Sequence, residues 1–175
     1  MICYRKIDLE QWEDIAHQVY DFVLETSILE TRHSWNTLDV DVLKCQIPDL
    51  FEAFGRLNLT VSNAAIIYRR PFYQGGVHID SGTGIRALIP VNNCVGSYTK
   101  FFEINRSMIQ KEQGMEQDVF YLVPNHAIVK EIASIETTTP FVFDPKIPHG
   151  VFTNPACTGP RLTLTVGFVE KITLN

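Results

Sequence analysis

Several features that mark whole classes of protein are missing from this sequence. It contains no apolar run long enough to cross a bilayer, and its first residues, Met1 to Lys6, lack the apolar stretch of a signal peptide. No basic cluster exceeds a pair such as Arg69-Arg70, and the net charge is -5. We therefore expect neither a membrane partner nor binding to a nucleic-acid backbone.

Closely paired cysteines are missing as well. The four cysteines, Cys3, Cys45, Cys94 and Cys157, are scattered along the chain. Structural zinc sites and disulfide frameworks use cysteines at short spacings, so this pattern favours reduced thiols in a cytoplasmic protein.

The length and composition fit one globular domain. The chain has 175 residues, of which 45% are hydrophobic and 20% charged, and it shows no internal repeat. A chain of this size can bury a core of its own. We expect a single domain over residues 1–175, with residues 1–58 as a helical support and residues 59–175 as a β-rich core.

Two helices are expected near the N-terminus. Over residues 9–24, apolar side chains recur every three or four positions while acidic ones fill the other side, which is typical of an amphipathic helix. Asp8 and Gln11 have the spacing of a capping box. Residues 48–54 predict a second helix with Pro48 in its first turn. Residues 38–43 are compatible with a short strand.

The rest of the sequence is typical of β-structure. Short runs of β-branched and aromatic residues are separated by Gly, Pro, Asn or Asp. They cover residues 59–69, 76–80, 85–91, 98–104, 119–123, 128–135, 141–143, 151–153 and 162–169. This series of short strands, without helical patterns between them, predicts an antiparallel sandwich or barrel with helices on one outer face.

One of these runs carries an imidazole and a carboxylate on the same side. Residues i and i+2 of a strand point to one face, so His78 and Asp80 would project into the same space. Much later in the chain, a Pro-His-Gly corner supplies His149. If His149 lies beside the pair, the three residues form a two-histidine, one-carboxylate site with open coordination positions. This is the ligand set of non-haem Fe(II) oxygen chemistry.

The last expected strand separates polar from apolar residues by face. Arg161, Thr163 and Thr165 alternate with Leu162, Leu164, Val166 and Phe168. The apolar face would pack on a neighbouring layer such as the helix of residues 9–24, and the polar face would line a wet cavity or meet solvent. An arginine at the mouth of such a cavity, with threonines below it, suits an anionic ligand.

Each motif has an ordinary explanation when taken alone. A His-x-Asp triplet arises by chance, a Pro-His-Gly corner is often only a turn, and a lone arginine usually lies on the surface. His33 and His126 are further histidines, but neither has a carboxylate at same-face spacing. The hypothesis of a metal site with a nearby anion-binding arginine therefore depends on the combination of these motifs and on their order along the expected strands.

In this combination the sequence resembles the 2-oxoglutarate/Fe(II)-dependent oxygenase superfamily. The matching elements are His78-Ile79-Asp80, Pro148-His149-Gly150 and Arg161-Leu162-Thr163. The resemblance implies a mainly β, double-stranded β-helix (jelly-roll) fold with one or two N-terminal helices packed on an outer face. It also implies Fe(II) bound by His78, Asp80 and His149.

The same resemblance implies 2-oxoglutarate as co-substrate, with its distal carboxylate bound by Arg161. Thr163, on the same face, could donate a hydroxyl to that carboxylate, as could Tyr68 or Tyr98 from an earlier strand. Asn92-Asn93-Cys94 and Arg86 lie near the expected mouth, where they could contact a substrate. The implied reaction is hydroxylation of an unactivated C–H bond of a small molecule or peptide side chain, with release of succinate and CO2.

Three other interpretations fit part of the pattern. A cupin has the same barrel, but its first motif needs His-x-His followed by a glutamate. A zinc hydrolase could use the same three ligands, but Arg161 and the threonine face would then have no role. The third is a non-catalytic jelly-roll module that binds a ligand or partner. The sequence selects neither a primary substrate nor an oligomeric state.

Overall fold

Two antiparallel sheets form the body of the molecule in the computed structural model, which describes residues 2–28, 35–80, 84–105, 107, 110–113, 119–122 and 129–174. The first sheet has the order β1 (Tyr4–Lys6), β10 (Phe141–Phe143), β5 (Arg86–Asn92), β12 (Arg161–Phe168), β3 (Val61–Arg69) and β2 (Trp35–Leu38). The second has the order β7 (Gln110–Gln113), β8 (Val119–Leu122), β4 (His78–Ile79), β11 (His149–Thr153), β6 (Ser97–Glu103) and β9 (Lys130–Glu136). This mainly β, two-sheet architecture confirms the expected fold class.

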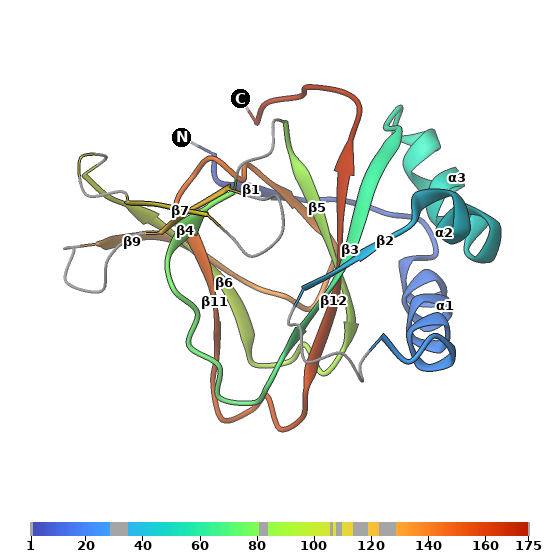
Figure 1. Ribbon diagram of the computed structural model, residues 1–175, viewed down its shortest axis with the longest axis horizontal. Coiled ribbons are helices and arrows are strands. Elements are labelled where there is room, and N and C mark those ends of the chain that lie inside the picture. Colours follow the sequence, from blue (N-terminus) through green and yellow to red (C-terminus); the bar gives the residue numbers. More distant parts are fainter. Residues whose placement is uncertain are drawn as a thin grey trace.

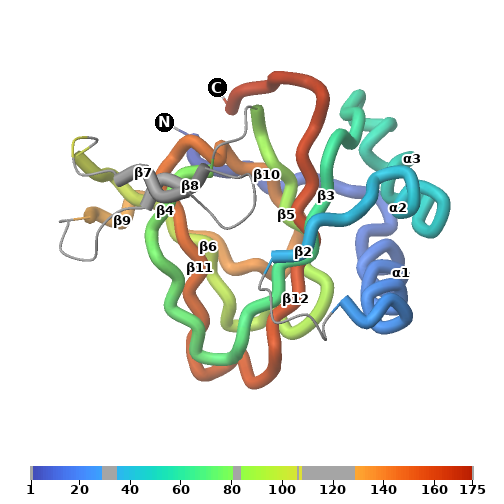
Figure 2. Tube along the Cα trace, in the orientation of Figure 1, coloured from blue at the N-terminus to red at the C-terminus, as the bar shows by residue number. Residues whose placement is uncertain are grey.

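Three helices cover the outer side of the first sheet in the described part of the chain. They are α1 (Trp12–Glu25), α2 (Val40–Gln46) and α3 (Pro48–Arg56). In Figure 1 they lie to the right of β3 and β12, while β4, β6 and β11 of the second sheet lie on the opposite side. Figure 2 shows the same grouping, with α1, α2 and α3 gathered beyond β2 and β3. The helices therefore support the barrel from outside and leave its interior to the two sheets.

Strand β12 lies at the centre of the first sheet and has two buried faces of opposite character. It pairs along its length with β3 on one side and β5 on the other. The leucine and valine side chains of its outer face join a cluster with the buried residues of α1 and α3, including Ile15, Val19 and Phe54. The rings of Phe54 and Phe168 lie 4.9 Å apart. The apolar face thus packs on the helices, as expected from its alternation.

The other face of β12 looks into the barrel. Thr165 lies opposite Leu88 of β5, and Leu88 lies opposite Phe141 of β10. Leu88 and Phe141 belong to a second apolar cluster that includes Phe101 of β6 and Ile135 of β9, on the other sheet. Because side chains alternate along a strand, Arg161 and the threonines of β12 share this interior face.

Two local expectations near the N-terminus are wrong. Helix α1 begins at Trp12 rather than at residue 9, since Gln11 is left-handed and makes no side-chain capping bond. The Asp8–Gln11 capping box is therefore absent. The strand expected at residues 38–43 is wrong beyond Leu38, which ends β2, because the Asp39 side chain accepts hydrogen bonds from the backbone N–H groups of Asp41 and Val42 and starts α2.

The expected boundary at residue 58 does not separate a helical part from a β part. Strand β1 pairs with β10, and β2 pairs with β3, so two N-terminal segments complete the first sheet. Both strands are short, and neither shows clear alternation in the sequence. His33 and His126 lie outside the described residues. No helix in the described ranges has the length and apolar character needed to cross a membrane.

The packing of β12 on the helices predicts the effect of a cavity. Leu164 is 0% exposed between the sheet and the helices. Leu164→Ala should lower the free energy of unfolding by about 2–5 kcal/mol, because it removes buried methyl groups and leaves a void. Urea denaturation measures this loss. Leu24→Ala on α1, where Leu24 is 53% exposed, is the control and should stay within about 0.5 kcal/mol of the parent. Equal losses in the two variants would contradict this description of the core.

Candidate metal centre

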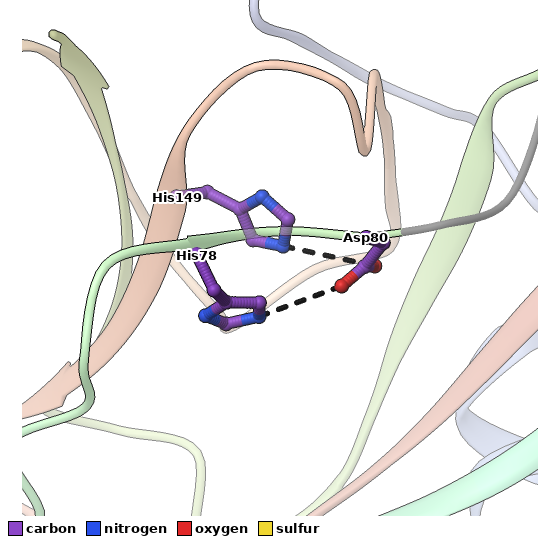
Figure 3. Close-up of side chains that lie close together, drawn as sticks. All are labelled: His78, Asp80 and His149. Atoms are coloured by element: carbon purple, nitrogen blue, oxygen red, sulfur yellow. Dashed lines mark ion pairs between the residues drawn. The ribbon is translucent and has the colours of Figure 1, made fainter. Parts of the chain in front are cut away.

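Three side chains from two distant parts of the sequence meet at β4 and β11, the two central strands of the second sheet. His78 lies on β4, Asp80 follows that strand, and His149 begins β11, where it pairs directly with His78. The ligand atoms of the three residues all lie within 4.8 Å of one another. Nε2 of His78 is 3.5 Å from Asp80 Oδ1, and Nε2 of His149 is 3.8 Å from Asp80 Oδ2 (Figure 3). The cluster can therefore offer two nitrogens and one oxygen to a single ion.

Backbone carbonyls orient both imidazoles. Nδ1 of His78 lies 3.0 Å from the Gly76 carbonyl oxygen, and Nδ1 of His149 lies 2.9 Å from that of Ile147. A carbonyl oxygen only accepts, so each Nδ1 carries the proton and donates it. In the neutral form of either ring, the lone pair is then on Nε2, the atom that faces Asp80. This arrangement of a ligating nitrogen backed by a second hydrogen bond is the usual one in metal sites.

The environment of His149 favours its neutral form. Burial lowers the pKa of His149 to about 4; His78 also lowers it, while Asp80 acts in the opposite direction. His149 is therefore a neutral imidazole at pH 7. Neutral imidazole is the form that binds metal ions.

Asp80 has cations as neighbours in addition to the two histidines. Nε of Arg86 lies 3.7 Å from Asp80 Oδ2. Lys146 Nζ donates to the Asp80 backbone carbonyl at 3.0 Å, and the Asp80 backbone N–H donates to the Pro145 carbonyl at 3.0 Å. The backbone around the carboxylate is thus tied to the segment that leads into β11. The sequence placed Arg86 near the mouth, and the structure places it beside the candidate ligand.

Arg161 is buried without a hydrogen-bond partner in the barrel interior. It is 0% exposed, and none of its three guanidinium nitrogens has a partner among the described residues. Burial lowers its pKa to about 10, so the group is still a cation at pH 7. The hydroxyl of Thr163, on the same face of β12, is also buried and has no hydrogen-bond partner among the residues that the structure describes. A buried, unpaired cation beside an unpaired hydroxyl suits a carboxylate ligand.

The two tyrosines proposed as helpers of Arg161 lie on other surfaces. Tyr68 pairs with Leu162 and packs against the cluster on the helix side of the sheet, so it does not share the face of Arg161. Tyr98 precedes Thr99 on β6, and it is Thr99 that is buried on the same side as Phe101. Period-two alternation explains both outcomes, since neighbouring residues of a strand point to opposite faces.

Sequence reasoning missed Thr99 and Trp35. The Thr99 hydroxyl is buried and has no hydrogen-bond partner within the described ranges. In this it resembles the hydroxyl of Thr163. The alternation of Thr99 with the interior Phe101 was a signal for its orientation. Trp35 lies on β2, and Cζ of Arg86 is 5.8 Å from the centroid of its ring. No local pattern indicated that contact.

Solved structures with the same architecture exist. A Pseudomonas putida prolyl-4-hydroxylase matches over 94% of this chain and 86% of its own, with 12% identity and a TM-score of 0.52. A prolyl hydroxylase of Trichoplax adhaerens, solved with a hypoxia-inducible-factor degradation-domain peptide fragment, matches over 94% and 82%, with 14% identity and a TM-score of 0.53. This chain has the double-stranded β-helix fold.

A third structural relative is the epimerase SnoN, solved with Fe3+, alpha-ketoglutarate and nogalamycin RO. It matches over 95% of this chain and 78% of its own, with 10% identity and a TM-score of 0.51. The likeness at these identities is one of fold, and it agrees with the fold implied by the resemblance to the oxygenase superfamily. No protein-family model matches the sequence, and no curated protein matches it significantly.

The lowered pKa of His149 predicts a fold that loses stability in mild acid. The folded-state value of about 4 is below the ordinary value of 6.5, so the unfolded chain binds more protons between these two pH values. The stabilisation is complete above pH 6.5 and is lost as pH falls towards 4. For the metal-free protein, the free energy of unfolding should drop by about 2 kcal/mol from pH 7 to pH 5 through this group.

Urea denaturation of the parent and of His149→Gln at both pH values measures this contribution. The variant lacks the titrating ring, so its free energy of unfolding should fall by about 2 kcal/mol less than that of the parent between pH 7 and pH 5. Equal losses in the two proteins would show that His149 is not held in its neutral form by burial.

Proposed function

We propose that this protein is a non-haem Fe(II)- and 2-oxoglutarate-dependent oxygenase. It would hydroxylate an unactivated C–H bond of a small molecule or peptide side chain, with release of succinate and CO2. One observation carries the proposal: a compact His-Asp-His cluster occurs together with a fully buried guanidinium that has no hydrogen-bond partner among the described residues. A site for a metal alone would not need the second feature.

The candidate ligands fit Fe(II). His78 and His149 would each ligate through Nε2, and Asp80 through a carboxylate oxygen, which leaves positions for a chelating co-substrate and oxygen. The hydrogen bonds from Nδ1 to the carbonyls of Gly76 and Ile147 keep each ring in the orientation that ligation needs. Bound Fe(II) and 2-oxoglutarate supply the oxidising chemistry, and the protein contributes position and a shielded interior.

Arg161 would hold the end of 2-oxoglutarate that is not at the metal. A planar guanidinium can donate two parallel hydrogen bonds to one carboxylate, and in a buried site this pairing is strong. The hydroxyls of Thr163 and Thr99 are available as further donors. Arg161 begins β12, whereas Arg86, the neighbour of Asp80, lies opposite Gly167 near the end of that strand, so the cation and the metal ligands lie toward opposite ends of β12. A 2-oxo dicarboxylate requires this polarity.

Relatives of the same fold support this choice of ligands. SnoN was solved with Fe3+ and alpha-ketoglutarate, and HygX from Streptomyces hygroscopicus was solved with iron, at a TM-score of 0.52 and 10% identity. The Trichoplax adhaerens enzyme holds a peptide fragment, so the fold accepts a peptide as well as a small molecule.

Anaerobic titration followed by admission of oxygen tests the proposal. The protein should bind Fe(II) and 2-oxoglutarate together, develop a visible charge-transfer band, and form succinate slowly once oxygen is present. A zinc hydrolase would be indifferent to 2-oxoglutarate, and a non-catalytic module would depend on neither component. Absence of both the band and succinate would therefore refute the proposal.

Removal of a candidate ligand should abolish these signals. His78→Ala and Asp80→Ala take away a nitrogen or the only anionic ligand of the cluster, so each should lose the band and metal-dependent succinate formation. His17→Ala and Asp21→Ala change the same residue types on the exposed face of α1 and should retain both signals. A normal band in Asp80→Ala would contradict the assignment of the ligands.

Arg161→Met separates a ligand-binding arginine from a structural one. The unpaired buried cation costs stability, so the variant should unfold at the same or higher urea concentration without ligand. When 2-oxoglutarate is added at about 100 times the parent dissociation constant, the free energy of unfolding of the metal-loaded parent should rise by about 2.7 kcal/mol. If Arg161→Met binds 2-oxoglutarate about 100-fold more weakly, its free energy of unfolding should rise by only about 0.4 kcal/mol.

The control is Arg56→Met, which removes an exposed guanidinium paired with Glu10 and should keep the full gain. An unchanged gain in Arg161→Met would remove Arg161 from the co-substrate site.

A further inference from the structure

Arg86 is a second arginine on the interior face of the first sheet, and the proposed chemistry gives it no task. It lies opposite Phe143 on β10 and opposite Gly167 on β12. Phe143 belongs to the apolar cluster between the sheets, so Arg86 projects to the same interior side. Its Nε is 3.7 Å from a carboxylate oxygen of Asp80. Arg86 therefore borders the metal centre directly.

The contact with Asp80 does not use the hydrogen-bonding capacity of Arg86. An arginine fixed by a carboxylate usually donates two parallel bonds at about 2.7–2.9 Å. Here Nε lies 3.7 Å from the carboxylate oxygen, and the Arg86 side chain makes no hydrogen bond within the described ranges. Asp80 is thus a charged neighbour of Arg86 rather than its hydrogen-bond partner.

Trp35 holds the guanidinium instead. Cζ of Arg86 lies 5.8 Å from the centroid of the indole, within the range of a cation–π contact. Strands β12 and β3 lie between the strands that carry the two side chains, so Arg86 and Trp35 meet above the interior face of the sheet. The residue opposite Arg86 on β12 is Gly167, where the Asn63 side chain of β3 fills the place that a side chain would take. A cation–π contact uses the charge of the guanidinium and does not require its N–H groups as hydrogen-bond donors.

His78 and Arg86 are the more exposed side chains around the metal centre. The side chains of His149 and Asp80 are 6% and 8% exposed, while those of Arg86 and His78 are 13% and 25% exposed. Lys146 adds a second cation next to Asp80. The whole chain has a net charge of -5, so positive charge at this point is a local feature. With Asp80 engaged by a metal, Arg86 would lack a counter-ion, and an anion arriving there would supply one.

We propose that Arg86, held against Trp35, binds a carboxylate of the primary substrate. This inference rests on the proposed function and names its substrate class: small molecules or peptides that carry a carboxylate near the carbon to be hydroxylated. Anchoring that carboxylate beside Asp80 places a nearby C–H bond next to the metal. Arg161 binds the co-substrate, and Arg86 selects the substrate.

Matched pairs of compounds test the charge requirement. Each N-acetyl amino acid is compared with its carboxamide, which has the same side chain but no negative charge. With Fe(II), 2-oxoglutarate and oxygen, the acids should stimulate succinate formation and gain one oxygen atom by mass spectrometry. The amides should be weaker by about tenfold or more, as expected for the loss of a charge-assisted contact. Equal responses from the two members of the pairs, or no response to any acid, would overturn the inference.

A binding measurement gives a second readout that does not depend on turnover. Trp12→Phe leaves Trp35 as the remaining tryptophan, since the chain has two. In this protein, loaded with Zn(II) and 2-oxoglutarate, an acid that engages Arg86 should change the emission of Trp35, and its amide should not. If the parent forms no charge-transfer band and no succinate, the proposed function fails; if those signals are present but no acid alters Trp35 emission, only the inference fails.

Substitution of Arg86 completes the test. Arg86→Gln should bring the ratio of acid to amide response close to one, and Arg86→Lys should restore part of it because the charge remains without the planar fork. Arg56→Gln removes a guanidinium from the outer helical layer and should keep the parent ratio. Metal affinity is measured in each variant. A reduced metal affinity with an unchanged ratio in Arg86→Gln would show that Arg86 only supports Asp80, and would overturn the proposal.

Discussion

The alternation of side chains along β12 is the constraint on which the rest of the structure depends. Its leucines and valine bind the helices to the sheet, while Arg161 and the threonines of the same strand are buried in the barrel. Burial of an unpaired guanidinium costs several kcal/mol, and the apolar packing on the other face offsets this cost. One strand therefore stabilises the fold and also carries a residue whose burial is unfavourable. Such a combination is typical of a functional site, where local stability is exchanged for ligand binding.

The metal centre depends on a second constraint, the pairing of β4 with β11. This pairing brings His78 and His149 opposite each other, although the two residues are far apart in the sequence. Backbone carbonyls then fix the orientation of each ring, and the segment before β11 holds Asp80 through its backbone. Main-chain groups thus orient both rings, while the Lys146 side chain also donates to the Asp80 carbonyl.

Much of this arrangement could be predicted from local patterns, and the failures have physical causes. The amphipathic repeat of α1, Pro48 at the start of α3 and the two faces of β12 follow from periodicities of a few residues, and the structure contains all three. The strand expected at 38–43 failed because the side chain of Asp39 caps a helix more effectively than the following valines favour a strand. Tyr68 and Tyr98 were chosen for their hydroxyls, whereas register decides which face each residue occupies, and a shift of one residue reverses it.

The sequence by itself determined the chemical groups and their spacing along each strand: an imidazole and a carboxylate two residues apart, a distant second imidazole, and an arginine that begins an alternating strand. These features depend on near neighbours, so they can be read without coordinates. Only the tertiary structure decided that His149 meets His78, that Thr99 faces inward, and that Trp35 reaches across two strands to Arg86. Contacts of this kind depend on how all the strands pair around a common core, and no short segment of the chain encodes that pairing.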